Sequence, residues 1–556
     1  MILSCKVVSV LGTNNPIKIK LAIFLQKMII LLIWVAVLIA VIVLYLRQIY
    51  STFSRNGIKH FKPIPLVGNI GKVMLRLDHI AYDLCNLYNS FPEERFVGRY
   101  EFLSEAVVIR DVELLKKITV KDFEYFLDHR NFDTDSFFGR SLFLLKGQEW
   151  KDMRSTLSPA FTSSKIRLMV PFMVEVGDQM IVSLKRKIEK SGDDYIDIEC
   201  KDLTTRYAND VIASCAFGLK VDSHSDENNQ FYQMGKEATN FTFVQIIMFF
   251  LLMHAPRLGK LLKWDLLSDA VKNFFTTLVL GTMKDREMRN IVRPDMIHLL
   301  MEVKKGKLTH GDVKSNDEAA GFATVEESSV GRKEITREWS DKDLVAQAFL
   351  FFLAGFESIS SSMSFLLYEL AVNPNVQERL VQEIRDYDAK NGGKFDFNSI
   401  QTMTYLDMVV SEVLRLWPPA LASDRICNKD YNLGKPNKSA EKDFILRKDA
   451  AILIPTFAIH RDPEFFPEPE KFNPDRFSEE NKHKINVLSY MPFGLGPRNC
   501  IGSRFALCEL KVMVYQLLRH MEVSPCEKTC IPAQLATDNF NIRLKGGHWL
   551  RFRLRK

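Results

Sequence analysis

One apolar segment restricts what this chain can fold into more than any other feature. Residues 28–46 read MIILLIWVAVLIAVIVLYL, nineteen residues without a charged side chain. At ~1.5 Å per residue, a helix of this length just spans the ~30 Å hydrocarbon core of a bilayer. Lipid offers no partner for backbone polar groups, so the segment must be helical there. A helix buried in a soluble core and a cleaved signal peptide are the alternatives. The length of the run disfavours both, and no small-residue cleavage site follows it.

The residues around this segment suggest a division of the chain. Basic residues flank the run on both sides, so the positive-inside rule favours a cytosolic C-terminal side only weakly. A start at Met28 would remove the preceding lysines, and we interpret residues 1–27 as an upstream extension or a misassigned start. Residues 28–46 are then the transmembrane anchor. Residues 47–70 form a hinge stiffened by Pro63 and Pro65, and residues 71–556 form one catalytic domain.

Composition excludes several classes of protein. The 556 residues carry a net charge of +7, spread without a block of like charge, so no nucleic-acid partner is indicated. A basic face for an acidic partner or an anionic membrane remains compatible with this charge. The nine cysteines are an odd, scattered set, which indicates a reducing compartment rather than a disulfide framework.

The body of the chain is patterned for helices. Helical periodicity dominates from about residue 75, and strand-like stretches are few, at residues 105–110 and 451–457. We therefore predict a mainly α fold with small β-sheets. The polar segment 303–340 is predicted to be an exposed loop within this body. The apolar segment 241–252 has three interpretations: core, the wall of an apolar pocket, or a second surface that dips into the membrane.

A single cysteine lies in an unusual loop near the C-terminus. Residues 493–502 read FGLGPRNCIG, and helical periodicity begins directly after them. Free N–H groups at a helix start stabilise a thiolate at Cys500. The glycines let backbone pass close to something large and flat, and Arg498 supplies a cation. A thiolate beside a flat group describes a haem ligand, and the alternative is a small buried cysteine. A dinucleotide-binding loop is excluded, because Asn499 stands where the third glycine belongs and no strand leads in.

The loop resembles the haem-binding signature F-x-x-G-x-R-x-C-x-G of the cytochromes P450. Phe493, Gly496, Arg498, Cys500 and Gly502 occupy its fixed positions. Four further stretches are similar to motifs of that family, in the family's order: WKDMR (Trp150 and Arg154), AGFES (Glu357 and Ser358), EVLR (Glu412 and Arg415) and NPDRF (Arg476). The resemblance covers residues 28–556 and is most like microsomal members from the arthropod branch that oxidises foreign lipophilic compounds.

The resemblance implies a set of roles for these residues. Haem b would be the cofactor, with the Cys500 thiolate as the iron ligand within the loop of Phe493 and Gly496. The side chains that bind the haem carboxylates would be Trp150, Arg154, Arg425 and Arg498. Glu357 and Ser358 would deliver protons during the activation of O2. Ser358 departs from the family's threonine, which keeps the hydroxyl but loses the methyl that restrains its rotamer and puts tight coupling in doubt.

Two further groups of charged residues are expected around the loop. Glu412 and Arg415 are three apart on one helix face, and with Arg476 they would form a buried structural triad. An exposed pair is the alternative for Glu412 and Arg415. Four basic residues beside the haem motifs are predicted to form a docking face for an electron donor, with ordinary solvated charge as the alternative: Lys146, Lys151, Arg504 and Lys511.

The resemblance implies a membrane-bound monooxygenase of lipophilic small molecules, either foreign compounds or endogenous lipids and hormones. No flavin or nicotinamide motif is visible, so electrons from NADPH would arrive through NADPH–cytochrome reductase, with cytochrome b5 as an additional donor. The expected location is the endoplasmic reticulum membrane, with the catalytic domain on its cytosolic face. Two other functions are weighed: a haem-thiolate enzyme that rearranges peroxides without O2 or reductase, and a non-catalytic protein that sequesters hydrophobic molecules.

Overall fold

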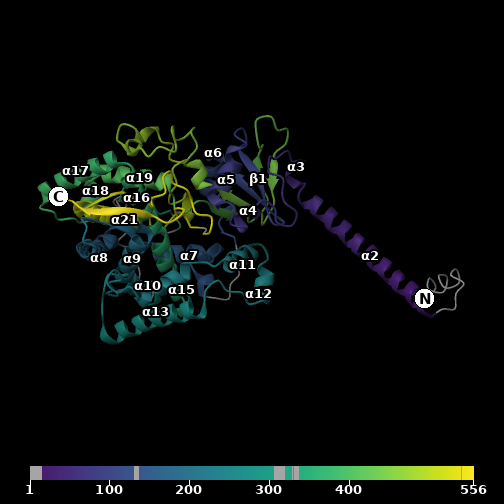
Figure 1. Ribbon diagram of the computed structural model, residues 1–556, viewed down its shortest axis with the longest axis horizontal. Helices are drawn as coiled ribbons and strands as arrows, with labels where there is room; N and C mark the ends of the chain where they lie inside the picture. The colour runs from purple at the N-terminus through teal and green to yellow at the C-terminus, as the bar shows by residue number, and fades with distance from the viewer. Residues whose placement is uncertain are drawn as a thin grey trace.

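The computed structural model describes residues 16–130, 137–305, 320–328, 330, 337–539 and 541–555. One long helix, α2 (Pro16–Ile49), projects away from a helical body (Figure 1). Within it, Ile23–Ile49 is long and apolar enough to cross a membrane, and none of it is buried against the body. The predicted helix is therefore confirmed, although it begins well before Met28. A second apolar stretch, Asp341–Val372, is largely buried within the body and is a core helix.

Within the part of the chain that the structure describes, three small sheets accompany the helices. The largest has the order β1-β2-β7-β4 and lies beside the end of α2 (Figure 1). It contains β1 (Phe96–Glu101), β2 (Ser104–Ile109), β7 (Ala451–Ile454) and β4 (Ser423–Ile426), and only β2 and β7 are parallel. The other sheets join β3 (Tyr195–Glu199), β9 (Trp549–Leu554) and β8 (Met521–Pro525), and β5 (Tyr431–Gly434) with β6 (Phe444–Leu446). Both predicted strands are present, and the predicted fold class is confirmed.

A bundle of helices forms the main core around one nearly continuous central helix. That helix consists of α15 (Asp341–Ala354), a π-helical turn η8 (Gly355–Ile359) and α16 (Ser360–Val372). Every residue of α16 up to Ala371 is buried. The helices that pack in this core are α8 (Ser163–Ser191), α9 (Cys200–Ile212), α19 (Thr404–Leu416) and α21 (Ser503–His520).

The remaining longer helices surround this bundle (Figure 1). Those on the N-terminal side are α5 (Ile80–Asn89), α7 (Gly147–Leu157), α10 (Gln230–Thr239), α11 (Phe243–His254) and α12 (Pro256–Leu261). Those that follow in the chain are α13 (Asp269–Arg289), α14 (Met296–Lys304), α17 (Pro374–Asn391) and α18 (Phe397–Thr402).

The apolar segment 241–252 folds as α11 and has a mixed environment. Ile246 and Phe250 are buried and pack against Ile70 and Val73 near the end of the anchor. Phe243 and Val244 are exposed at the start of the helix. The segment therefore combines the core and surface interpretations, since one face is buried and the other is open. It contributes no side chain to the cavity described below, so the pocket-wall interpretation is wrong.

The prediction of an exposed loop at 303–340 is wrong for part of its described residues. Residues 320–328, which we call the strap, pack onto the body. Ala320 and Ala323 are buried, and the Phe322 ring lies against Phe477 and Tyr490. The polarity of the segment indicated exposure to solvent, but its few apolar side chains pack onto the body and Glu327 pairs with Arg154. Residues 306–319, 329 and 331–336 lie outside the described residues.

The predicted triad is present and buried. Glu412 and Arg415 on α19 are fully buried and form two hydrogen bonds of 2.7 and 2.9 Å. Arg476 reaches the same carboxylate at 3.2 Å, and the amide of Asn473 also donates to it. Arg415 donates in addition to the carbonyl of His460 at 2.8 Å. The carboxylate is thus fully hydrogen-bonded, which is the condition under which a buried ion pair is tolerated.

Candidate active site

A cavity of ≈ 460 Å³ lies between the central helix and the loop that contains Cys500. Its size is within the ~300–1,000 Å³ typical of small-molecule sites, and its lining is mostly apolar. The lining includes residues from five separate stretches of the chain: the predicted site residues Trp150, Arg154, Ser358, Arg425, Phe493, Arg498 and Cys500, together with His129. The fold therefore brings together residues that are up to about 370 positions apart in sequence.

The loop of Cys500 is held by backbone contacts. The Cys500 amide donates to the carbonyl of Phe493 at 2.8 Å, and α21 begins at Ser503, just after the loop, as predicted. Burial raises the pKa of the Cys500 thiol, and the Gly502 amide and the Arg154 charge only partly oppose it. A bound metal ion would instead lower the pKa of the Cys500 thiol, because a thiol that coordinates a metal ion is deprotonated.

Gly496 of this loop is required by packing against another part of the chain. Gly494 and Gly496 have φ of +77° and +71°, in the left-handed region that favours glycine. A Cβ at Gly496 would lie 1.9 Å from the Thr119 carbonyl oxygen, so the backbone here passes close to another backbone segment. Gly355 in the central helix is similar, because a Cβ there would lie 2.3 Å from the Ile212 side chain.

Two arginines bring positive charge to the cavity lining, and Asp128 compensates that of Arg498 at 3.6 Å. Burial lowers the pKa of Arg425 to about 10, and Asp424 opposes this only in part. Among the described residues, its guanidinium makes one hydrogen bond, to the Asp424 carbonyl at 2.6 Å. Burial and the neighbouring Arg425 also lower the pKa of Arg498, which stacks at 4.0 Å over the Trp150 ring. Buried cations need a counter-charge, so the cavity fits a ligand with carboxylate groups.

Sequence reasoning missed a third basic group at the same place, His129. Its Nδ1 lies 3.0 Å from the Asp424 carboxylate, and its ring stacks on Phe143. The contacts of His129 and Arg130 hold the pKa of Asp424 well below its usual range, although burial alone would raise it. The pairing of His129 with Asp424 orients the imidazole within the cavity lining. The two residues are 295 positions apart, so no local pattern could have revealed the pair.

Arg154 lines the cavity, but most of its hydrogen bonds point elsewhere. Its guanidinium pairs with Glu327 of the strap at 2.6 Å and donates to the Asn499 carbonyl and side chain at 2.7 and 2.8 Å. Of the three arginines expected to bind haem carboxylates, Arg154 pairs with Glu327 at 2.6 Å and Arg498 with Asp128 at 3.6 Å, whereas Arg425 has no such ion pair among the described residues.

The central helix places Ser358 and Glu357 on different sides. Ser358 lines the cavity, and its hydroxyl donates to the Ala354 carbonyl at 2.5 Å. This bond back to the preceding turn coincides with the π-helical turn of η8. Phe351 also lines the cavity, whereas Phe352 and Phe356 pack into an aromatic cluster away from it.

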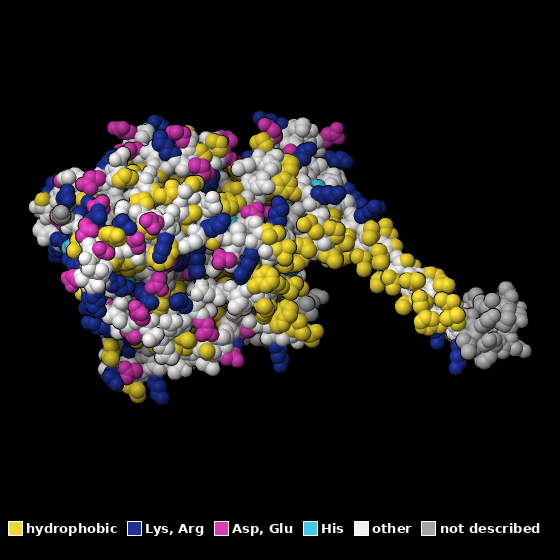
Figure 2. Space-filling view, viewed as in Figure 1, with side chains coloured by type: hydrophobic (Ala, Val, Ile, Leu, Met, Phe, Trp, Pro, Cys, Tyr) yellow, Lys and Arg dark blue, Asp and Glu magenta, His cyan; other side chains and the backbone are white. Residues whose placement is uncertain are grey.

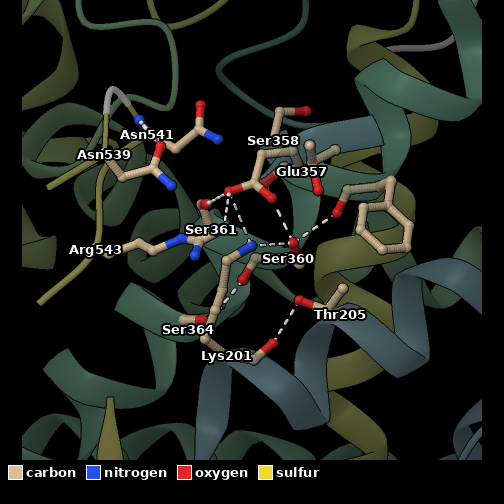
Figure 3. A network of polar contacts seen from close by, with 12 residues as sticks. Lys201, Thr205, Glu357, Ser358, Ser360, Ser361, Ser364, Asn539, Asn541 and Arg543 are labelled. Carbon is tan, nitrogen blue, oxygen red and sulfur yellow. Dashed lines mark hydrogen bonds and ion pairs between the residues drawn. The ribbon is translucent and has the colours of Figure 1, made fainter. Parts of the chain in front are cut away.

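The Glu357 carboxylate belongs to a buried polar network (Figure 3). It pairs with Lys201 of α9 at 3.2 Å and with Arg543 of the C-terminal loop at 3.4 Å. The Ser361 hydroxyl donates to it at 3.3 Å, and Lys201 donates to the Ser360 hydroxyl. Burial lowers the pKa of Lys201, with Glu357 opposing that effect. Sequence reasoning identified Glu357 but missed both cations, which come from distant elements.

The predicted docking face is only partly present. The Lys511 side chain is 1% exposed and lies beneath the strap, and Arg504 is also buried. These two residues cannot meet a partner, so their assignment is wrong. Lys146 is exposed, and Lys151 is partly exposed and pairs with Glu124 at 2.7 Å.

Comparison with known proteins gives a consistent result. The family model for cytochrome P450 matches residues 59–549. Cytochrome P450 9e2 of Blattella germanica is 44% identical over 516 residues, covering 90% of this chain and 93% of that protein. Probable cytochrome P450 9f2 of Drosophila melanogaster is 42% identical over 510 residues, covering 90% and 94%. Cytochrome P450 6k1 of Blattella germanica is 34% identical over 524 residues, covering 94% and 96%.

Proposed function

This chain belongs to the cytochrome P450 family, and on that premise we propose that it is a membrane-anchored monooxygenase of lipophilic small molecules, driven by a partner reductase. The observation that carries the proposal is the composition of one cavity, which Cys500, Ser358 and Arg425 all line. A soft metal ligand, a hydroxyl and an uncompensated cation then face one apolar space. That combination suits a metal-bearing anionic cofactor beside an apolar substrate.

The residues present fit haem b. Cys500 would hold the iron, and Arg425, Arg498 and His129 would hold the carboxylates. Arg498 already donates to the Leu127 and Leu145 carbonyls and stacks on Trp150, so Arg425 is the arginine with more donors available for a carboxylate. When bound, the haem supplies the activation of O2 that oxidises the substrate. The chain contributes the rest: it binds the cofactor in one orientation, excludes water with an apolar lining, and supplies protons.

Ser358 and Glu357 are the proposed proton donors. The Ser358 hydroxyl is the one on the cavity side, and its back-bond to Ala354 holds it at the widened π-helical turn. Glu357 lies one residue away, outside the cavity lining, and pairs with the cations Lys201 and Arg543. A proton passed from this network to the Ser358 hydroxyl would reach the cavity without opening it to bulk water. The missing methyl of Ser358 makes that hydroxyl freer to rotate than a threonine hydroxyl.

The body also presents a surface suited to a membrane. Apolar side chains gather along α2 and over the adjoining part of the body (Figure 2). Exposed large apolar residues near α4 (Gly71–Met74), α11 and α12 include Leu75, Leu77, Phe243, Val244 and Leu261. We propose that this face rests on the same bilayer that α2 crosses, with the hinge of residues 47–70 between them. The endoplasmic reticulum, with the body on the cytosolic face, remains the proposed location.

Electrons are proposed to come from NADPH through a flavoprotein reductase, with cytochrome b5 as an additional donor. Lys146 and Lys151 remain as candidates for an acidic partner to contact. Reversal of both to Glu should slow reduction by the reductase and leave haem content unchanged. An unchanged rate would remove them from the docking face.

The substrate class follows from the lining of the cavity. Leu350, Phe351 and Ile359 present apolar side chains from the central helix, and Phe161 faces them from another element. This lining suits lipophilic molecules, which include foreign compounds and endogenous lipids or hormones. Turnover with an organic peroxide but not with NADPH and reductase would instead support a peroxide-rearranging enzyme. Haem incorporation with no turnover at all would support a sequestering protein.

The first test is the carbon monoxide difference spectrum of the reduced, membrane-expressed protein. We expect the strongly red-shifted band of thiolate-ligated haem in the wild type and in Cys526→Ser, a control at a partly exposed cysteine. Cys500→Ser should abolish that band. A folded, haem-containing wild type without the band would refute thiolate ligation by Cys500 and the oxygen chemistry that depends on it.

A further inference from the structure

The strap of residues 320–328 lies against the loop of Cys500 outside the cavity. None of its residues lines the cavity, yet it contacts the residue immediately before Cys500. It is fixed at both ends by hydrogen bonds to buried or half-buried side chains. These contacts point to a role in holding the loop in place.

The first end of the strap is fastened to α19 and α21. Lys511 donates to the Ala320 carbonyl at 2.7 Å and pairs with Asp407 at 2.8 Å. Asp407 in turn accepts from the Phe322 amide at 2.9 Å. Gly321 between them has φ of +152°, and a Cβ there would lie 2.0 Å from the Asp407 carboxylate. This end is therefore a close fit that only glycine permits.

The second end is fastened to α7 and to the cysteine loop. The Glu327 carboxylate accepts from Arg154 Nε at 3.1 Å and Nη2 at 2.6 Å, and from the Ser158 hydroxyl at 3.0 Å. The Asn499 side chain donates to the Glu326 carbonyl at 2.9 Å. Arg154 completes the arrangement by donating to both oxygens of Asn499.

The geometry leaves Arg154 little capacity for a ligand in the cavity. A guanidinium has five N–H donors, and four of them are taken up by these contacts to Glu327 and Asn499. Contacts with Glu327 on one side and with Asn499 on the other therefore fix the position of the Arg154 guanidinium. Arg425 differs, because its hydrogen bonds among the described residues leave most of its donors available.

We propose that Glu327 is a positioning residue for Cys500: its carboxylate holds the Arg154 guanidinium against Asn499 and so fixes the peptide that carries the thiolate. This inference rests on the proposed function only in assigning the thiolate to Cys500. The clamp itself is a property of the chain. It makes the strap an integral part of the site rather than a surface loop.

The test compares Glu327→Gln with Glu326→Gln in the full-length, membrane-expressed protein. The two changes remove the same charge from adjacent residues, but only the Glu327 side chain contacts Arg154, since Glu326 contributes its carbonyl. Two properties are measured: the rate at which the red-shifted carbon monoxide band is lost on mild warming, and hydrogen exchange of the amides of residues 495–502 in cofactor-free protein.

We expect Glu327→Gln to lose the band and exchange these amides about fivefold faster, because the neutral amide gives up a charge-assisted pair. Glu326→Gln should match the wild type, and Glu327→Asp should fall between the two. Equal behaviour of Glu327→Gln and Glu326→Gln would overturn the proposal. If the wild type lacked the band, the proposed function would fail, and the exchange measurement would still decide whether Glu327 clamps the loop.

Discussion

Replacement of Arg415 by Met tests the energetic role of the buried triad. Arg415 and Glu412 are both 0% exposed, and the change removes two hydrogen bonds to Glu412 and one to the His460 carbonyl. Glu412 would keep only Arg476 and the Asn473 amide as partners. Breaking a buried pair by removing one member costs ~3–5 kcal/mol, because an uncompensated charge stays buried. An exposed i,i+3 pair contributes only ~0.2–0.5 kcal/mol.

This magnitude gives a measurable change in the melting temperature. Unfolding entropy of ~2.1 cal/mol/K per residue amounts to about 1 kcal/mol/K for a domain of this size, so Tm should fall by about 3–5 °C. The assay is thermal unfolding in detergent at one fixed scan rate, followed by tryptophan fluorescence. Lys482→Met is the matched control, because Lys482 pairs with Glu479 at the same i,i+3 spacing but on the surface.

The control should change Tm by less than about 1 °C, since an exposed pair contributes little. If Arg415→Met and Lys482→Met lowered Tm equally, the triad would contribute no more than a surface pair. The assignment of these residues to a buried structural triad that stabilises the fold would then be refuted.

Three further predictions follow from individual sites. Burial raises the pKa of Glu369 to about 7 in the folded protein, above its usual value of ~4.5, so the wild type loses stability as pH rises from ~4.5 to 7 and the buried carboxyl becomes charged. The neutral variant Glu369→Gln should therefore be more stable than the wild type by up to ~3 kcal/mol at pH 8 and equally stable at pH 4. Measurement of Tm for both proteins across this pH range checks the prediction. Gly496→Ala should prevent haem incorporation, because the new Cβ would meet the Thr119 carbonyl. The control Gly192→Ala changes a glycine that has a similar φ but open space around it, and it should retain haem. Equal haem content in the two variants would refute the clash. Ser358→Ala should lower the product formed per NADPH consumed by about tenfold and raise the release of peroxide. Ser358→Thr should raise the product formed per NADPH above that of the wild type. Unchanged ratios in both variants would show that Ser358 does not deliver protons.

Local sequence patterns were sufficient for several parts of this protein. A long uncharged run must be a helix in lipid, so the anchor helix could be predicted without any tertiary information. The spacing of Glu412 and Arg415 puts them on one helix face, and Ser358 can bond back to Ala354 within its own helix. Each of these depends on residues a few positions apart. The motif around Cys500 likewise identified the family, because its signature is contiguous.

Other features were decided only by the tertiary structure, because they depend on which groups become buried together. Lys511 looks like a surface cation in sequence, but the strap covers it and its charge is satisfied by Asp407. Lys201 gives no local sign that it will meet Glu357. Arg154 was expected to face a cofactor, yet a carboxylate 173 residues away takes up its charge. Burial and charge compensation are set by packing between distant elements, so local pattern can suggest a residue's chemistry but only the folded chain decides its partner.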